Sequence, residues 1–204
     1  MEAEDVTGKR LIERVFVRLV SSMRRTVFNG PQKVFETATG QETADLYVIV
    51  WLCILILLCS GLSYSTSAWM LALAGMLAAY RLGDLLSHHS YSMFAGRTGE
   101  RSTAEAAILI AFINLIQVGL CFGILFLIDE HIARESFVMM SGAKTFRIGE
   151  AVYYSFVTLT TLGASDITAV RCGAKVLTVI EVFVGLALIV LILGRHLARH
   201  SRNT

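Results

Sequence analysis

The chain has 204 residues, of which 55% are hydrophobic and 17% charged, and it contains a single proline. This composition excludes an ordinary soluble domain, in which about a quarter of the residues are charged. The net charge of +2 gives no indication of nucleic-acid binding, and the four cysteines do not predict a disulfide framework.

The first 45 residues contain a basic amphipathic pattern. Within residues 9–28, apolar side chains recur at helical spacing, while Arg10, Arg14 and Arg18 fall on another face. A helix of this kind just before a span commonly lies in the membrane interface. A solvated helix that packs on its own protein is the alternative. We expect residues 1–45 to form a cytoplasmic segment with an interfacial helix.

Four long apolar runs follow, and about 20 residues of helix cross a bilayer core. The runs are Leu46–Tyr64, Ala68–Tyr80 with an extension to Leu86, Ala106–Ile128 and Val176–Leu193. Arg81 and Asp84 mark the polar end of the second run. The sequence therefore predicts an all-α membrane protein with four transmembrane helices. The first two, in residues 46–86, lack arginines at every third position and so do not resemble a voltage sensor.

Lysine and arginine are divided unevenly between the two sides of the membrane. Seven lie in residues 1–45, three in residues 81–103 and three from Arg195 onwards, against five on the other side. Cytoplasmic loops carry the excess of basic residues. We therefore expect both termini in the cytoplasm, with the protein integral to the plasma membrane. Residues 87–103 are then a cytoplasmic loop and residues 199–204 a short cytoplasmic tail.

A shorter apolar segment lies between the third and fourth runs. Residues 148–160, IGEAVYYSFVTLT, are too few to cross a bilayer, and segments of this length are more often re-entrant. The polar run Thr161–Asp166 follows, and by Val176 the chain has entered another span. Extended backbone at membrane depth is tolerated only where it is buried in protein or lines a watery path. The sequence therefore predicts a re-entrant pore helix and loop.

Gly163-Ala164-Ser165 also fits the turn of a serine hydrolase or an intramembrane protease. Such a nucleophile needs a base within hydrogen-bond reach, and all five histidines lie in loops or at helix ends. The nucleophile elbow also requires a second glycine where this chain has Asp166. We therefore do not expect an enzyme.

The run AVYYSFVTLTTLGASD resembles the pore helix and selectivity filter of the potassium-channel superfamily, whose filter reads T-V-G-Y-G-D. The matching residues are Tyr153, Tyr154, Ser155, Thr158, Thr160, Thr161, Gly163 and Asp166, with Leu162 at the valine position. The resemblance covers residues 104–198 and implies an outer helix, a pore helix, a filter and an inner helix. It further implies a homotetramer in the lipid bilayer, with no cofactor, small-molecule substrate or nucleic acid as partner.

The resemblance also implies roles for individual residues. The filter is Thr161, Leu162, Gly163, Ala164, Ser165 and Asp166, and it is supported by the matching residues of the pore helix. Rings of carbonyl oxygens replace the hydration shell of the ion in such filters. Thr161 and Leu162 would bind a monovalent cation, K⁺ or Na⁺, through their oxygens. Asp166 would either ring the outer mouth or form a hydrogen bond with Tyr153 behind the filter.

Two filter positions depart from the family. Ala164 replaces the tyrosine, and Ser165 replaces the second glycine, whose backbone angles cost a residue with a Cβ about 1 kcal/mol. We therefore expect a widened or differently folded outer half of the filter, with weakened K⁺/Na⁺ selectivity. A non-conducting membrane scaffold or accessory subunit that keeps the channel fold is the alternative.

The last span carries three further candidates. Gly185 falls where the inner helix of the family often has its hinge, although close packing is an equal explanation. Ile189 and Leu193 lie four residues apart and could form a dewetting constriction. Glu181 is an ionisable residue inside a span and so a functional candidate, unless it pairs near the pore helix.

Overall fold

The structure, a computed structural model, describes residues 41–94, 104–140, 145–163 and 166–200. Its elements are, in chain order, α3 (Gln41–Tyr64), α4 (Ala68–Phe94), α5 (Ala104–Ala133), β1 (Phe137–Met139), α6 (Ile148–Leu159), β2 (Ile167–Ala169) and α7 (Cys172–His200). The interfacial helix expected in residues 9–28 lies outside the described residues.

Four of these helices are long and apolar enough to cross a membrane. The segments are Leu46–Tyr64, Ala68–Ser87, Ile108–Ala133 and Cys172–Val190. The predicted class, an all-α membrane protein with four spanning helices, is confirmed. Helix α4 continues to Phe94, so residues 87–94, which the sequence assigns to a loop, are helical instead.

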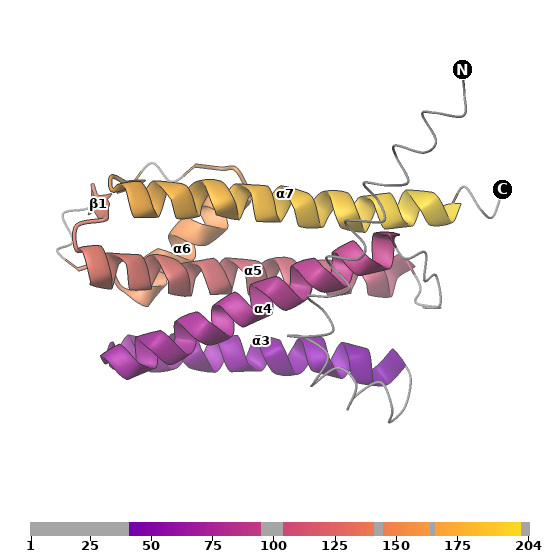
Figure 1. Cartoon of the computed structure of the whole chain (residues 1–204), viewed down its shortest axis with the longest axis horizontal. Coiled ribbons are helices and arrows are strands. Elements are labelled where there is room, and N and C mark those ends of the chain that lie inside the picture. The colour runs from indigo at the N-terminus through magenta and orange to yellow at the C-terminus, as the bar shows by residue number, and fades with distance from the viewer. Residues whose placement is uncertain (1–40, 95–103, 141–144, 164–165, 201–204) are drawn as a thin grey trace, which may run out of the picture.

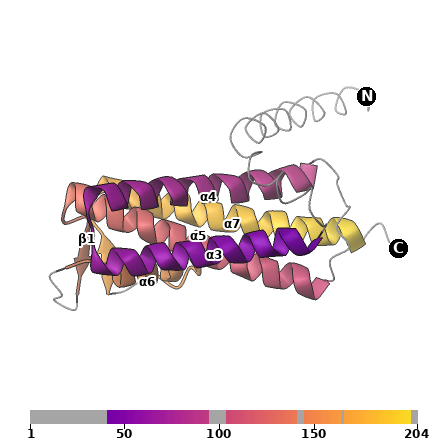
Figure 2. The same cartoon turned by 90° about the horizontal axis from the view of Figure 1, so that it is seen from below.

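Helix α5 is the centre of the bundle and contacts α3, α4, α6 and α7. The four long helices run roughly lengthwise, with α4 inclined to the others in Figure 1, and Figure 2 shows the same bundle from below. The short α6 packs against α5 and α7. The interior face of α5 supplies many of the core side chains: Val118, Cys121, Phe122, Ile124 and Phe126. The face of α5 that is not covered by the chain is apolar as well, with Ile108, Leu109 and Phe112 exposed, as expected for a helix in a membrane.

Helices α5 and α6 come close together because two glycines face the contact. Gly119 and Gly123 are four residues apart, the spacing that lets helix backbones approach in membranes. A Cβ on Gly123 would lie 2.9 Å from the Cα of Val152, and one on Gly119 would touch the ring of Phe156. The short helix is therefore held against the backbone of α5.

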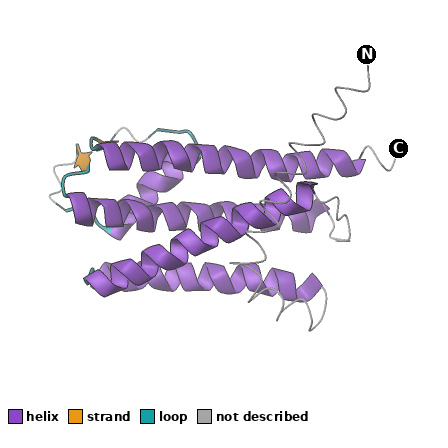
Figure 3. Ribbon diagram, viewed as in Figure 1, coloured by secondary structure: helices purple, strands orange, loops and turns teal. Residues whose placement is uncertain are grey.

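Two three-residue strands, which the sequence did not predict, pair at one end of the bundle (Figure 3). They are antiparallel, with Phe137 opposite Ala169 and Met139 opposite Ile167. The first strand follows α5, the predicted outer helix, and the second follows the predicted filter segment, Thr161–Asp166. The ladder therefore ties the chain after the filter to the end of α5.

An aromatic cluster supports this end of the bundle. The ring of Phe126 on α5 lies 5.6 Å from Phe137 on β1 and 5.0 Å from Tyr154 on α6, both edge-on. Phe137 also stacks on Phe146 at 4.4 Å, just before α6. Edge-to-face and offset rings at these separations are favourable beyond their burial. The cluster fixes the start of α6 and strand β1 on the outer helix.

The glycine contact gives a stability prediction. Gly123→Ala should lower the free energy of unfolding by about 1–3 kcal/mol, because the new methyl group meets the backbone of Val152. Gly149→Ala is the matched control, since a Cβ there has nothing within 4 Å and Ala favours a helix over Gly. Thermal unfolding in detergent checks both. Equal melting of the two variants would contradict the close α5–α6 contact.

Candidate functional site

Helix α6 is too short to cross a membrane. Its 12 residues extend about 18 Å, against a hydrocarbon core of about 30 Å. It begins at Ile148, where the backbone N–H of Arg147 donates to Glu150 Oε2 at 3.0 Å. Ala151, Ser155 and Leu159 follow on the buried face at helical spacing. The predicted re-entrant helix, residues 148–160, therefore agrees with the observed one to within a residue.

The C-terminal end of α6 leads directly into the predicted filter. The N–H of Leu162 donates to the carbonyl of Val157 at 3.0 Å, and the N–H of Thr161 donates to Thr158 at 2.9 Å. These two bonds form a Schellman motif, which requires a left-handed residue directly after the cap. Glycine normally fills that position, but here it is Thr161, with φ of 58°.

A left-handed β-branched residue is an outlier that costs about 1–2 kcal/mol. Thr161 is further held by its hydroxyl, which donates to the carbonyl of Thr160 at 2.7 Å. Such strain concentrates at functional sites. Thr161 is also the first residue of the predicted filter, so the strained position and the predicted ion-binding position coincide.

The segment Thr160–Gly163 lies exposed on the surface of the chain. Leu162 is 79% exposed, although it is a large apolar residue. Gly163 has a positive φ of 74°, which a residue with a Cβ rarely adopts. Ala164 and Ser165, the two positions that depart from the family, lie outside the described residues.

Asp166 and Tyr153 are hydrogen-bonded to each other. The Tyr153 hydroxyl donates to Asp166 Oδ1 over 3.3 Å. The negative charge of Asp166 raises the pKa of the Tyr153 phenol, so this donor keeps its proton. Of the two roles that the sequence leaves open for Asp166, the structure provides the contact for the supporting one, while the carboxylate is still exposed.

Ser155 and Glu181 form a buried polar contact between α6 and α7. The Ser155 hydroxyl lies 2.8 Å from the Gly119 carbonyl and in hydrogen-bond contact with Glu181, which is 0% exposed. A serine has one hydroxyl proton, so only a protonated Glu181 lets both contacts be hydrogen bonds at once. Glu181 therefore pairs with the pore helix, and Tyr154 makes a second polar contact to α7 through Thr178 at 3.1 Å.

These contacts set the depth of the filter segment in the bundle. Ser155 is level with Gly119, which lies in the middle of the span Ile108–Ala133. A Cβ on Gly185 of α7 would meet Leu159, the last residue of α6. The helix therefore ends deep within the bundle, and Gly185 has a packing reason for having no side chain. Its role as a hinge stays a prediction.

Helix α7, the predicted inner helix, exposes one apolar stripe and buries the opposite one. Ala174, Glu181, Gly185 and Leu188 are buried, whereas the exposed stripe consists of Val176, Val179, Ile180, Phe183, Leu186, Ile189 and Val190. Ile189, a predicted gate residue, is thus on the exposed face. The side chain of Leu193 lies outside the described part of α7, so the gate stays a prediction.

Glu130, at the end of the outer helix, fixes the turn into β1. Its carboxylate accepts the backbone N–H groups of Glu135 at 3.0 Å, Ser136 at 2.8 Å and Phe137 at 3.2 Å. Arg134 and Glu135 have positive φ of 47° and 57°, and the carboxylate satisfies the donors that this turn leaves unpaired.

From this turn, backbone bonds continue to the filter segment. The Ser136 carbonyl accepts the N–H of Val170 at 2.9 Å, and the N–H of Met140 donates to the carbonyl of Asp166 at 2.8 Å. The outer end of the filter segment is therefore held by a ladder that Glu130 anchors.

Sequence reasoning missed three of these features. The Gly119-Leu-Cys-Phe-Gly123 spacing is a recognisable signal for close helix packing. Arg81, at the polar end of the second hydrophobic run, is also buried, at 1% exposed, and could have been read as a functional candidate inside a span. No local pattern pointed to Glu130, because its partners follow an irregular turn. Among the described residues, no group of three or more His, Cys, Asp or Glu side chains could hold a metal ion.

A family model described as "Ion channel" matches residues 115–198. The matched segment runs from within α5 through α6 and the filter to Ala198 of α7, and the family module is the two-transmembrane, potassium-channel-like pore. No curated protein and no solved structure matches the chain significantly. With four helices long and apolar enough to cross a membrane and this match, the chain is an integral membrane protein. Over residues 115–198 it resembles the two-helix pore module of potassium channels, as the sequence predicted.

The Glu130 anchor gives a local prediction. In Glu130→Gln, one carboxylate oxygen becomes a donor, so the amides of Met140 and Val170 should exchange hydrogen about tenfold faster, as expected when a bond to a charged group worth about 1.5 kcal/mol is lost. Hydrogen–deuterium exchange with mass spectrometry measures this. Glu135→Gln, which removes a charge from the same turn but leaves the Glu130 bonds, should exchange like the wild type. Unchanged protection in Glu130→Gln would exclude the anchoring role.

Proposed function

We propose that the protein is a homotetrameric cation channel of the potassium-channel type, which conducts monovalent cations through backbone carbonyls of Thr161–Gly163. The permeant ion is K⁺, with discrimination against Na⁺ weaker than in a strict potassium channel. On this proposal, conduction needs no cofactor.

The observation that carries this proposal is the placement of exposed, non-helical backbone deep in a membrane bundle. Residues Thr160–Gly163 follow a short helix that ends beside Gly185, and they lie on the surface of the chain. Such backbone facing lipid would leave N–H and C=O groups without partners, at several kcal/mol each. A shared, water-filled axis removes that cost, and it also gives the carbonyls an ion to bind.

The apolar surface of the same region supports association with further copies. Leu162 is exposed within the filter segment, and the exposed stripe on α7 includes Phe183, at 68%. Four chains arranged about one axis would cover Leu162 and bring four Asp166 carboxylates to the outer mouth. Negative charge there raises the local concentration of cations.

The weaker selectivity follows from Ala164 and Ser165. Without the tyrosine ring and the second glycine of the family, fewer successive carbonyl rings can hold a dehydrated ion. In the inner half, Thr161 matches the family and Leu162 stands at its valine position, and both are held by the helix-capping bonds at the end of α6. A cation would therefore be stripped of water mainly at the inner positions.

We further propose that the bundle end with β1 and β2 faces outward, with both termini in the cytoplasm of a cell whose plasma membrane holds the channel. This orientation rests on the excess of lysine and arginine on the side of the termini. Arg81, which the sequence groups with the cytoplasmic loop, is instead buried on α4 and does not count toward that excess. The other basic residues on the side of the termini still outnumber the five on the opposite side.

Flux into proteoliposomes tests the proposal. The wild-type protein should take up K⁺, and Thr161→Ala should lower the uptake by at least about tenfold, because one oxygen of the inner site is lost. Thr145→Ala, which changes an exposed threonine just before α6, should conduct like the wild type. Bi-ionic reversal potentials should then give a K⁺/Na⁺ permeability ratio below that of a strict potassium channel.

Three outcomes would contradict parts of the proposal. A ratio as high as that of a strict channel would refute the widened outer filter. Mass photometry that finds monomers or dimers would refute the tetramer. Vesicles that stay tight with correctly assembled tetramers would favour the non-conducting scaffold, for which Ala164 and Ser165 are the sequence evidence.

A further inference from the structure

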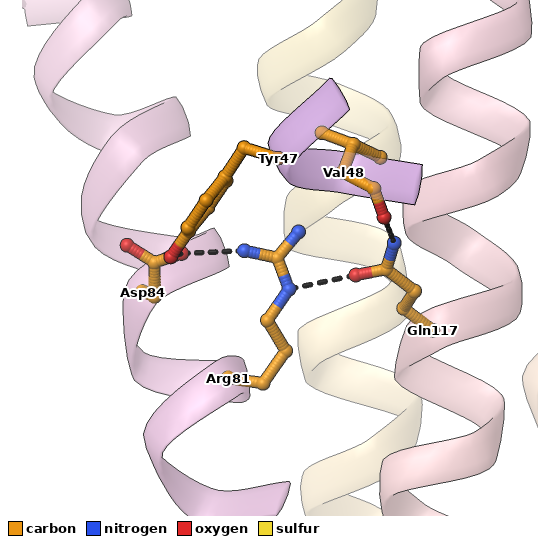
Figure 4. A network of polar contacts seen from close by, with 5 residues as sticks. All are labelled: Tyr47, Val48, Arg81, Asp84 and Gln117. Atoms are coloured by element: carbon orange, nitrogen blue, oxygen red, sulfur yellow. Dashed lines mark hydrogen bonds and ion pairs between the residues drawn. The ribbon is translucent and has the colours of Figure 1, made fainter. Parts of the chain in front are cut away.

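The N-terminal helix pair, α3 and α4, carries a buried ion pair that lies outside the matched segment 115–198. Arg81 and Asp84 on α4 are 1% and 2% exposed, and Arg81 Nη1 donates to Asp84 Oδ2. Charged side chains inside a span are costly, and where they occur they commonly mark a function. Figure 4 shows the two residues with Tyr47, Val48 and Gln117.

This ion pair is enclosed by α3. The Tyr47 hydroxyl donates to Asp84 Oδ2 at 3.0 Å, and the Arg81 guanidinium lies 5.2 Å from the Tyr47 ring centroid and 5.5 Å from that of Trp51. Aromatic faces attract a desolvated guanidinium. The first two helices therefore hold Arg81 in one orientation.

Gln117 connects this cluster to the outer helix of the pore module. It is 0% exposed, and its Oε1 accepts the N–H of Arg81 Nε at 2.7 Å while its Nε2 donates to the Val48 carbonyl on α3 at 2.8 Å (Figure 4). An amide that uses both ends fixes the rotation of α5 relative to α3 and α4 at the same time.

The opposite side of α5 holds the pore helix. Gly119 is two residues from Gln117, about 200° further around the helix, and its carbonyl accepts the Ser155 hydroxyl at 2.8 Å. Ser155 in turn contacts Glu181 on α7. No side chain separates Gly119 from α6. A rotation of α5 about its own axis therefore moves the Gly119–Ser155 contact that positions α6.

We propose that the N-terminal helix pair sets the position of the pore helix, with Arg81 and Gln117 as positioning residues that act through α5 on the Gly119–Ser155 contact. This regulation rests on the proposed conduction through Thr161–Gly163. It gives the first two helices a role distinct from voltage sensing, because Arg81 and Asp84 form a neutral pair that would move together.

A double-mutant cycle in the full chain tests this coupling. Gln117→Leu keeps the size of the side chain but removes both hydrogen bonds, and Ser155→Ala removes the contact on the other side of α5. Each variant should shift the K⁺/Na⁺ permeability ratio or the open probability by about threefold, and the double variant should shift it no more than the larger single one. Ile116→Leu, at the neighbouring exposed position of α5, is the matched control and should leave both readouts unchanged.

Effects that multiply in the double variant, or wild-type behaviour of Gln117→Leu, would overturn the positioning role. If Gln117→Leu does not assemble, Gln117→Asn replaces it, because the shorter side chain draws the amide away from Arg81 and Val48 but stays polar. Multiplying effects in its double variant, or wild-type behaviour of the single variant, would again overturn the positioning role.

A second readout separates this inference from the proposed function. Hydrogen exchange of the α6 amides should be faster in Gln117→Leu than in Ile116→Leu, although residue 117 faces away from α6. This measurement needs no conduction. A protein that does not conduct but shows faster exchange would refute the channel and keep the positioning, while unchanged exchange in a conducting protein would refute the positioning alone.

Discussion

Backbone N–H and C=O groups cannot stay unpaired in hydrocarbon, and this constraint organises the whole chain. Four long helices satisfy it internally. In the described part of the chain, the non-helical stretch Thr160–Gly163 lies deep in the bundle and satisfies this constraint in part through the capping bonds at the end of α6. On the proposed channel, its carbonyl groups face water and ions on a shared axis. For this reason, the irregular segment is unfavourable in a single chain that faces lipid, and it is the basis of the proposed channel.

Helix α5 makes this arrangement possible because its faces carry different chemistry. Gly119 and Gly123 let α6 approach the backbone, and Gln117 turns toward the N-terminal pair. Glu130 at its end orders the turn into β1. One helix thus carries the contacts for the depth of the pore helix, the outer end of the filter segment and the attachment of the first two spans.

Much of the candidate site was predictable, because it depends on local sequence. The pore helix was found to within a residue, since a short apolar segment followed by polar residues allows few structures at membrane depth. Glu181 could be named as a candidate, but its partner Ser155 is 26 residues away, so only packing brings the two together. Thr161 was expected in the filter, whereas its left-handed backbone follows from the helix cap that precedes it.

The sequence by itself determined that this is a membrane protein with four spanning helices and a pore-like loop. Those features depend on the length of each hydrophobic segment and on local motifs, and both are properties of residues that are close together in the sequence. The tertiary structure alone decided that Arg81 lies inside the bundle and that Gln117 joins three helices. Only it showed the strand pair that holds the chain beyond the filter. Such contacts depend on the rotation and depth of each helix, which follow from the packing of all the helices together.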